Sequence, residues 1–406
     1  MKPKLLLCLA LVLSGCSTSR GIETVPPGYP WISFNGKQLL FRNQLWDVKS
    51  GRQIRQFAVP PQITISNGVA HGYGYVEAVA FSPDGKKVLT ATAHLLGPEM
   101  VGPGPVQLWD IASGRKLLEF DSDKRIENAQ FLPDGKRILM MSEDGNFPIQ
   151  IWDAKTGQRL LALRDRPVSI FSGALADFSP DGRLIAAQGQ AGIEGHYYGT
   201  VNIWDSISGP KICTITGSTN SFFASARFSP DGKSILTGEM TDRQPKTMIW
   251  DVKTGHRIRE FFEVHPVTFT PDGRKVICSG TNGLALFYLK SNRETQHFTT
   301  PESFPAPDSG AWMPEKIMLS PDGKRLIVQY SASTSTAAQI LVALWNAETG
   351  KLIKHFGREN QMVWETMVGF SPKGENLMLF NNNGKPELFD GRTGERLQVL
   401  ENFQLP

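Results

Sequence analysis

The chain has 406 residues, of which 40% are hydrophobic and 20% are charged, a composition typical of globular proteins. Its formal net charge is +4, and removal of Lys2 and Lys4 with an N-terminal signal lowers this to +2. So small a positive charge argues against nucleic acid as a partner, and no apolar run after the N-terminal segment is long enough to span a bilayer.

The first twenty residues, MKPKLLLCLALVLSGCSTSR, have the organisation of a secretory signal. Two lysines precede an apolar run from residue 5 to residue 13 that is too short for a membrane helix. The following Leu13-Ser14-Gly15-Cys16 resembles the lipobox of bacterial lipoproteins, which implies removal of residues 1–15 and acylation of Cys16, with palmitate among the acyl groups. The residue after the cysteine is Ser17 and not Asp, which resembles lipoproteins that are sorted to the outer membrane. An ordinary signal peptide that contains cysteines is the alternative.

Two phrases recur along the rest of the chain, and each has the chemistry of a tight turn. The first is FSPDG or a close variant, which begins at Phe81, Phe131, Phe178, Phe228, Phe269, Leu319 and Phe370, with a shortened relative at Phe34. The second is WDxxTG or a close variant, which begins at Trp46, Trp109, Trp152, Trp204, Trp250, Phe287, Trp345 and Phe389. Proline presets φ, Asp and Ser or Thr bond to local amides, and Gly accepts a positive φ, so we expect both phrases to close hairpins.

Around these turns each unit carries four short apolar segments, such as those at residues 79–81, 88–91, 106–109 and 116–120. They predict four antiparallel strands per unit, which we call a to d. So small a sheet cannot bury both faces alone, and eight units are therefore expected to stack into a ring. The pattern resembles the WD-repeat β-propeller family, with Trp-Asp at the end of strand c. The resemblance implies one all-β propeller over residues 31–406, joined by a tether within residues 16–30 to the lipidated cysteine.

The units depart from the family in two respects. The Gly-His pair that opens the family's repeats is nearly absent, with His71-Gly72 as the nearest match, so the hydrogen-bonded tetrad of the family is not expected in most blades. The first unit lacks SPDG and leaves little room between strands b and c, so a seven-bladed ring with this unit displaced is the alternative to eight blades.

Strands of a blade alternate in direction, so the a–b and c–d turns lie on one side of the disc and the b–c and d–a connections on the other. Extra length occurs only in the second set, near residues 58–75, 93–105, 189–200, 298–314 and 331–338. Long connections on a rigid scaffold commonly carry function, and Tyr, Trp and Met are enriched at protein interfaces. The residues expected to form a partner-binding face are His71, Tyr73, Tyr75, His94, Met100, His196, Tyr197, Tyr198, Trp312 and Trp364. Burial is the favoured interpretation for Trp364.

The sequence contains no HExxH, GxSxG or GxxxxGK[ST] motif and no strand-linked GxGxxG motif, so we expect neither an enzyme nor a cofactor. The PDG aspartates lack the ligand ladder of a calcium loop and are interpreted as turn residues. No metal site is expected, although His71, His94 and His196 could meet over the channel mouth.

These features predict a monomeric scaffold in the cell envelope, held by its lipid at the periplasmic face of the outer membrane, that binds one or more envelope proteins through its looped face. One alternative is a hydrolase or lactonase that uses Glu77, Glu127 and Asp177 on the channel-lining first strands. Another is a sensor of a small ligand or glycan. Cys213 and Cys278 fall in different units and are expected to be buried free thiols.

Overall fold

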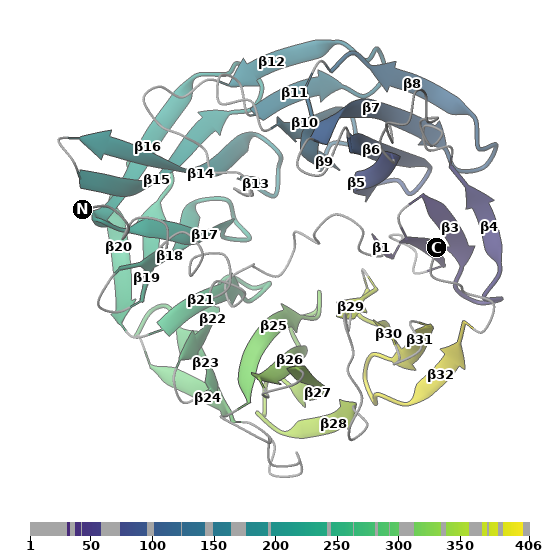
Figure 1. Cartoon of the computed structure of the whole chain (residues 1–406). Coiled ribbons are helices and arrows are strands. Elements are labelled where there is room, and N and C mark those ends of the chain that lie inside the picture. Colours follow the sequence, from purple (N-terminus) through teal and green to yellow (C-terminus); the bar gives the residue numbers. More distant parts are fainter. Residues whose placement is uncertain are drawn as a thin grey trace, which may run out of the picture.

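The computed structural model describes residues 31–32, 37–41, 43–57, 74–95, 101–122, 124–142, 149–163, 176–193, 196–241, 245–262, 264–280, 283–291, 293–299, 312–333, 338–356, 368–371, 373–380 and 385–400. Within these ranges every regular element is a β-strand, and the strands form eight four-stranded antiparallel sheets around a central axis (Figure 1). No helix there has the length and apolar character that a membrane-spanning segment requires. The signal peptide and tether predicted for residues 1–30 lie outside the described residues.

The first four blades are built from consecutive strands of two to ten residues. Blade one contains β1 (Trp31–Ile32), β2 (Gln38–Phe41), β3 (Gln44–Asp47) and β4 (Gln53–Gln56). Blade two contains β5 (Gly74–Phe81), β6 (Lys87–Leu95), β7 (Val101–Asp110) and β8 (Lys116–Phe120). Blade three contains β9 (Ile126–Phe131), β10 (Arg137–Ser142), β11 (Ile149–Asp153) and β12 (Arg159–Leu163). Blade four contains β13 (Ala176–Phe178), β14 (Leu184–Ile193), β15 (His196–Asp205) and β16 (Lys211–Thr219).

The last four blades follow the same order. Blade five contains β17 (Phe222–Phe228), β18 (Ser234–Met240), β19 (Lys246–Asp251) and β20 (Arg257–Phe262). Blade six contains β21 (Val264–Phe269), β22 (Lys275–Gly280), β23 (Gly283–Tyr288) and β24 (Glu294–Phe298). Blade seven contains β25 (Met313–Leu319), β26 (Arg325–Ser333), β27 (Ala338–Asn346) and β28 (Leu352–Phe356). Blade eight contains β29 (Val368–Phe370), β30 (Asn376–Phe380), β31 (Pro386–Asp390) and β32 (Arg396–Val399).

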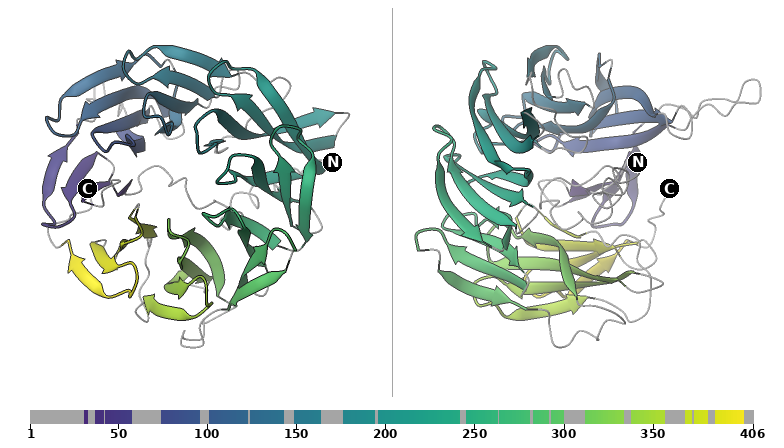
Figure 2. Two further views of the ribbon diagram at one scale, coloured as in Figure 1. Left: turned by 180° about the vertical axis from the view of Figure 1, so that it is seen from behind. Right: turned by 60° about the vertical axis from the view of Figure 1, so that its left-hand side comes forward.

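The ring is complete and closes without exchanging a strand between its two ends (Figure 2). Blade one, which lacks the SPDG turn, is a full sheet, and its innermost strand β1 contacts both β29 of blade eight and β5 of blade two. The eight-bladed propeller predicted from the repeats is therefore confirmed, and the seven-bladed alternative is wrong. Blade one is packed on both sides: Trp46 lies in a buried cluster with residues of blade eight, and Leu45 lies in one with residues of blade two.

Buried apolar clusters lie between neighbouring blades and hold the ring together. At five of the eight junctions the aromatic residue that begins the WDxxTG phrase, which we call the marker aromatic, packs against an aromatic residue at the end of strand d in the preceding blade. Phe57 lies 5.6 Å from Trp109, and Phe298 lies 5.8 Å from Trp345, measured between ring centroids. At the other three junctions the marker aromatic shares a buried cluster with Leu163, Ile215 or Leu400 of the preceding blade, so in every unit this residue packs between blades.

The two recurrent phrases form hairpin turns through local hydrogen bonds. Asp84 accepts bonds from the Ser82 hydroxyl at 2.6 Å and from the Lys86 amide at 3.0 Å. Asp110 accepts bonds from the hydroxyl of Ser113 at 2.6 Å and from its amide at 2.7 Å. The Ser82 hydroxyl lowers the pKa of Asp84, and the Ser113 hydroxyl and amide lower the pKa of Asp110, so both carboxylates stay ionised in their turns.

The third and fourth strands of every blade share one irregularity that the sequence analysis did not predict. In blade two, Leu108 pairs with Leu118 and Trp109 pairs with Lys116, which leaves Leu117 as an extra residue in a β-bulge. The same shift occurs beside the marker aromatic in the other seven blades.

Candidate partner-binding face

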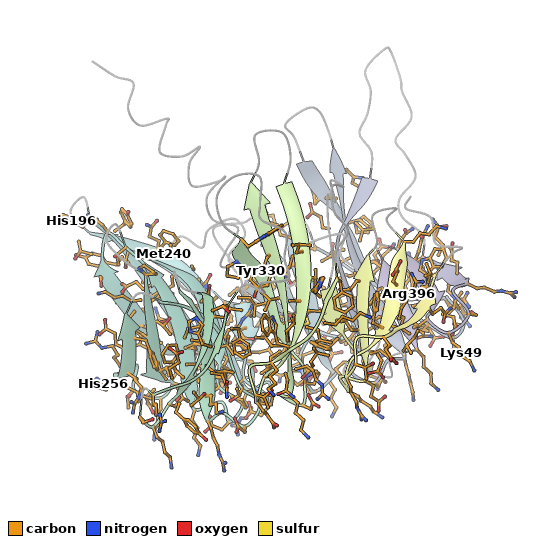
Figure 3. All side chains as sticks on the ribbon, turned by 90° about the horizontal axis from the view of Figure 1, so that it is seen from below. Lys49, His196, Met240, His256, Tyr330 and Arg396 are labelled. Atoms are coloured by element: carbon orange, nitrogen blue, oxygen red, sulfur yellow. The ribbon has the colours of Figure 1, made fainter. Side chains whose placement is uncertain are left out.

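The two sides of the disc differ in how far their hairpins project. On the plain side, as we call it, the described a–b and c–d turns are short in every blade. On the other, decorated side, the b–c hairpins β6–β7, β14–β15 and β26–β27 extend beyond the rest. Figure 3 shows His196 and Met240 toward the decorated side, and Lys49 and His256 toward the plain side.

Three connections that were expected to be loops continue the neighbouring strands wherever the structure describes them, so the expectation of loops is corrected for those residues. The pairing of β6–β7 continues to residues 95 and 101, that of β14–β15 to residues 193 and 196, and that of β26–β27 to residues 333 and 338. In a continued strand pair the backbone N–H and C=O groups bond to each other, whereas in a projecting loop they must find hydrogen-bond partners in water or side chains. In these three blades the described part of the decorated side is therefore raised sheet.

The residues predicted for the partner-binding face occupy different environments. His196 and Tyr197 are exposed at the start of β15, and Tyr198 beside them is half-buried. Tyr75 lies in β5, and His94 lies half-buried in the facing strand β6. The remaining predicted residues, His71, Tyr73, Met100 and Trp364, lie outside the described residues.

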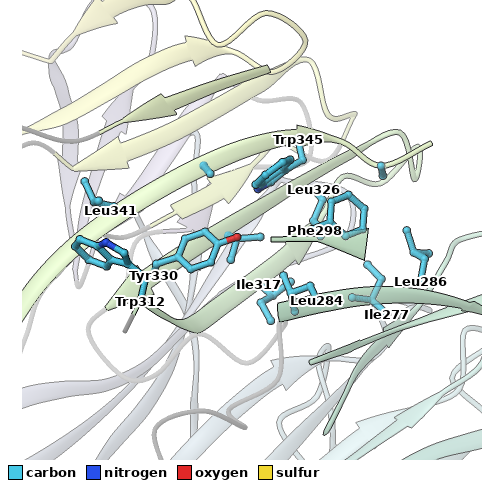
Figure 4. Close-up of a cluster of buried hydrophobic side chains, with 13 residues drawn as sticks. Ile277, Leu284, Leu286, Phe298, Trp312, Ile317, Leu326, Tyr330, Leu341 and Trp345 are labelled. Atoms are coloured by element: carbon cyan, nitrogen blue, oxygen red, sulfur yellow. The ribbon is translucent and has the colours of Figure 1, made fainter. Parts of the chain in front are cut away.

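Trp312 belongs to the core and not to the exposed face, so its prediction as a surface residue is corrected. Its side chain is 8% exposed and lies in the cluster between blades six and seven with Tyr330 and Leu341 (Figure 4). Both of these residues belong to the β26–β27 hairpin, whose extension provides the apolar surface that covers the indole. An indole has a large apolar area, so burial against this hairpin is favourable.

The most continuous raised surface in the described chain lies on blades four and five, and we call it the crest. It comprises residues 189–193, 196–199, 216–223 and 239–241. β14 and β15 pair without interruption to their tip, and β16 follows them as far as Thr219, opposite Tyr198. Asn220 reverses the chain with a positive φ of 55°, and its amide donates a 2.7 Å hydrogen bond to the carbonyl of Tyr197. The turn and the predicted aromatic pair are therefore joined through the backbone.

A buried carboxylate braces this turn from the neighbouring blade. Glu239 of β18 is 1% exposed and accepts hydrogen bonds from the Ser218 amide, from the Ser221 hydroxyl at 2.7 Å and from the Ser218 hydroxyl at 3.2 Å. A Cβ on Gly217 would lie 2.7 Å from both the Glu239 carboxylate and the Ser221 hydroxyl, so a larger residue here would displace these two groups. Because a buried carboxylate without donors is costly, these bonds fix the position of the turn.

The crest presents aromatic and sulfur-containing side chains on a rigid base. Tyr197 is 40% exposed, and His196 is exposed beside it. Phe222 and Met240 are half-buried and pair across β17 and β18. Aromatic residues and Met are enriched in protein interfaces, and a surface that is already ordered loses little entropy on binding. This arrangement fits recognition of another protein.

Met240 and Glu239 were missed by the sequence analysis. Both lie at the end of a segment that reads as an ordinary strand b, and nothing in that segment indicates a surface or a buried acid. Met240 joins the crest because β18 pairs with β17, and Glu239 meets its serines across a blade boundary. No local pattern in the sequence could have indicated either contact.

Two of the three channel carboxylates singled out in the sequence, Glu77 and Asp177, are engaged in contacts between blades. Glu77 is 3% exposed and lies 2.7 Å from the Arg125 guanidinium, and Glu127 lies 3.9 Å from it. Asp177 of blade four accepts a 2.8 Å hydrogen bond from the Phe228 amide of blade five. A buried carboxylate with an arginine or amide partner stabilises the junction of the two blades that provide them.

The remaining candidate features of the described residues are metal ligands, two cysteine thiols and one groove. No group of three or more His, Cys, Asp and Glu side chains there is placed to hold a metal ion. Cys278 is a buried free thiol, and desolvation raises its pKa to about 12. Cys213 is a half-buried free thiol, less buried than expected, and donates to the Val252 carbonyl at 3.2 Å. A shallow groove of about 450 Å³ lies between residues 103–105 of β7 and residues 119–122 at and after the end of β8.

Known proteins resemble this chain in sequence and in fold. No protein-family model matches the chain. It is 29% identical over 208 residues to a protein of Deinococcus radiodurans described as an uncharacterized WD repeat-containing protein, a match that covers 44% of this chain and 72% of the relative. A chain in the solved structure of Kuenenia stuttgartiensis hydrazine synthase superposes with a TM-score of 0.52 at 14% identity, covering 93% of this chain and 98% of that one.

The likeness to the hydrazine synthase chain concerns the fold alone, because the sequence identity is low. The match to the Deinococcus radiodurans protein, together with eight blades that each carry an aromatic residue at the end of strand c, supports a place in the WD-repeat and propeller family.

Proposed function

We propose that this chain is a lipid-anchored β-propeller of the bacterial cell envelope that binds an envelope protein through the crest of blades four and five. The observation that carries the proposal is the braced turn at residues 218–221, which holds Tyr197 at the exposed edge of the crest. The similarity to a WD repeat-containing protein is consistent with a scaffold. The engagement of Glu77 and Asp177 between blades is the reason we favour binding over channel chemistry.

The anchoring part of the proposal rests on the lipobox at residues 13–16 and on Ser17. Acyl chains at about 0.8 kcal/mol per buried CH₂ would hold the propeller at the periplasmic face of the outer membrane. Replacement Cys16→Ser removes the acylated side chain and is expected to release the protein from the membrane fraction when broken cells are washed at high salt, which screens contacts between charges but does not extract an acyl anchor. A Cys16→Ser chain that remains with the outer membrane after the high-salt wash would contradict anchoring by lipid.

The binding part is tested by crosslinking in cells. A photo-reactive amino acid is placed at Tyr197 on the crest, or at Ile207, which is 61% exposed in the c–d turn of the same blade on the plain side. Both positions belong to blade four, so they differ mainly in the side of the disc that they report. We expect an adduct with one envelope protein from position 197 and none from position 207.

Mass spectrometry of the adducts then identifies the partner. The same proteins at both positions, or no adduct above background at position 197, would show that the crest is not a specific binding surface.

A further inference from the structure

The plain side carries a ring of basic side chains that the proposed function does not use. In blades one to seven the residue directly after the glycine of the a–b turn is Lys or Arg, and all of these side chains are exposed. They are Lys37, Lys86, Lys136, Arg183, Lys233, Arg274 and Lys324. In blade eight the lysine is at position 373, two residues earlier relative to the turn. We call this set the basic ring.

The aspartates of these turns do not cancel the ring. Each PDG aspartate balances one basic residue, and the Ser82 hydroxyl and Lys86 amide hold the Asp84 carboxylate within its own turn. In four blades a second basic residue follows, as Lys87 follows Lys86. None of the a–b turns (82–87 and its equivalents) or c–d turns (110–116 and its equivalents) has a net negative charge. Together they carry more positive charge than the whole chain, so the remainder of the chain is net acidic.

The shape of the plain side matches this distribution. The a–b turns lie at the inner end of each blade, and the glycine of one turn faces the proline of the turn before it, as Gly135 faces Pro83 and Gly182 faces Pro133. The described a–b turns close with the same local hydrogen bonds and have nearly the same length, so they surround the channel mouth on the side of the disc opposite the crest. Figure 3 shows the two sides edge-on. A compact acidic ligand would reach only a few of these turns, whereas a flat anionic surface meets all of them together.

We propose that the plain side docks on a bilayer that contains anionic lipids. Phosphate headgroups would contact the basic ring and the basic residues of the c–d turns, and the net acidic remainder of the molecule would point away from the membrane. This adds a second membrane contact to the lipid on Cys16. The surface does not depend on that lipid, but in an anchored chain it orients the wheel so that the crest faces the aqueous space where a partner protein can reach it.

The tether permits this orientation. β1 is an innermost strand and begins on the decorated side, so residues 17–30 must pass blade one to reach a bilayer below the plain side. Strands of at most four residues make blade one about 13 Å tall, the smallest of the eight. Fourteen residues of extended chain reach up to about 45 Å, more than three times that height.

The test uses the chain from residue 16 onward with Cys16→Ser, which retains the whole closed ring and carries no acyl group. Binding is measured by co-sedimentation with vesicles of phosphatidylcholine, with or without phosphatidylglycerol. The variant Lys136→Gln with Lys324→Gln removes two charges from the basic ring. Its matched control, Lys124→Gln with Lys354→Gln, removes two exposed charges outside the short turns. Thermal unfolding of each variant establishes that it is folded.

We expect binding that requires phosphatidylglycerol. The loss should be about 25-fold in the basic-ring variant and at most about twofold in the control, since each basic side chain at an anionic membrane contributes ~1 kcal/mol, or about fivefold. Equal losses in the two variants, or equal binding to both vesicles, would overturn the proposal. Soluble polyglutamate that binds the chain while the anionic vesicles do not would assign the surface to an acidic polypeptide instead. Any of these results leaves the crosslinking at Tyr197 unaffected, so the two proposals can fail separately.

Discussion

At the scale of single residues, the repeated phrases are explained by contacts that each blade must make. Asp110 closes its own turn, and the aromatic residue before it, Trp109, packs against Phe57 of the blade before. The indole of Trp109 also donates to the Thr90 hydroxyl at 2.9 Å, so a buried N–H is satisfied without the family's histidine. Trp250 makes the equivalent bond to Thr237 at 2.7 Å. One residue thus serves both the inside of its blade and the junction with its neighbour.

Substitution of two turn glycines by alanine can distinguish the cost of backbone strain from the cost of a steric clash with the neighbouring blade. Gly85 and Gly323 both have a positive φ, 66° and 71°, so alanine at either position is strained by about 1 kcal/mol or more. A Cβ on Gly85 would meet nothing within 4 Å, whereas one on Gly323 would lie 3.0 Å from Pro271 of the preceding blade. We expect Gly323→Ala to lower the melting temperature more than Gly85→Ala. Equal shifts would show that the turn-to-turn contact contributes nothing.

At the scale of elements, the extended hairpins give the disc its two different sides. β14–β15 rises above the blade, and β16 and β17 rise with it because the turn between them is held by Glu239. The crest is therefore stabilised by contacts across the boundary of blades four and five. A short projecting hairpin alone would be marginal in water, so these contacts also account for its order.

Removal of one acceptor from this brace should loosen the crest without unfolding the ring. Glu239→Gln places an amide NH₂ against hydroxyl and amide donors, and an unsatisfied buried group costs about 1–3 kcal/mol. Hydrogen exchange is expected to accelerate at residues 217–221 and at Tyr197, with little change in distant blades. The control Glu119→Gln changes an acid whose side chain is 50% exposed and should leave the exchange rates of the crest unchanged. Uniform acceleration through all blades would contradict a local role for Glu239.

At the scale of the whole molecule, the ring depends on one junction between the two ends of the chain. Trp46 and Val48 of blade one share a buried cluster with Leu388 and Leu400 of blade eight. No strand is exchanged between the two ends, since each blade contains four consecutive strands, and buried apolar packing joins blades one and eight. Its strength should therefore depend on the volume of the side chains at this junction.

Two leucines near the C-terminal end of the propeller provide a matched test of closure. Leu400 is 0% exposed at the junction, and Leu397 on β32 is 54% exposed. We expect Leu400→Ala to destabilise the protein by about 2–5 kcal/mol and to increase proteolysis at the ends of the ring, because it leaves a cavity. Leu397→Ala should change stability by less than about 0.5 kcal/mol. Similar effects of the two substitutions in urea unfolding would argue against closure through this cluster.

The sequence by itself determined the number of units, the order of their strands and the positions of their turns. These features are local: a turn such as 82–87 is closed by hydrogen bonds between residues no more than five apart, so its chemistry can be read from a short phrase. The lengths of the connections were likewise visible in the sequence, and the alternating direction of the strands assigned the short and the long connections to opposite sides of the disc.

The tertiary structure alone decided how the ring closes, which aromatic residues are exposed and what braces the crest. Trp46 meets Leu400 across almost the whole chain, Trp312 is covered by the hairpin that follows it, and Glu239 finds its donors across a blade boundary. Each outcome depends on which surfaces are brought together when the blades pack, and a pattern of neighbouring residues carries no information about that.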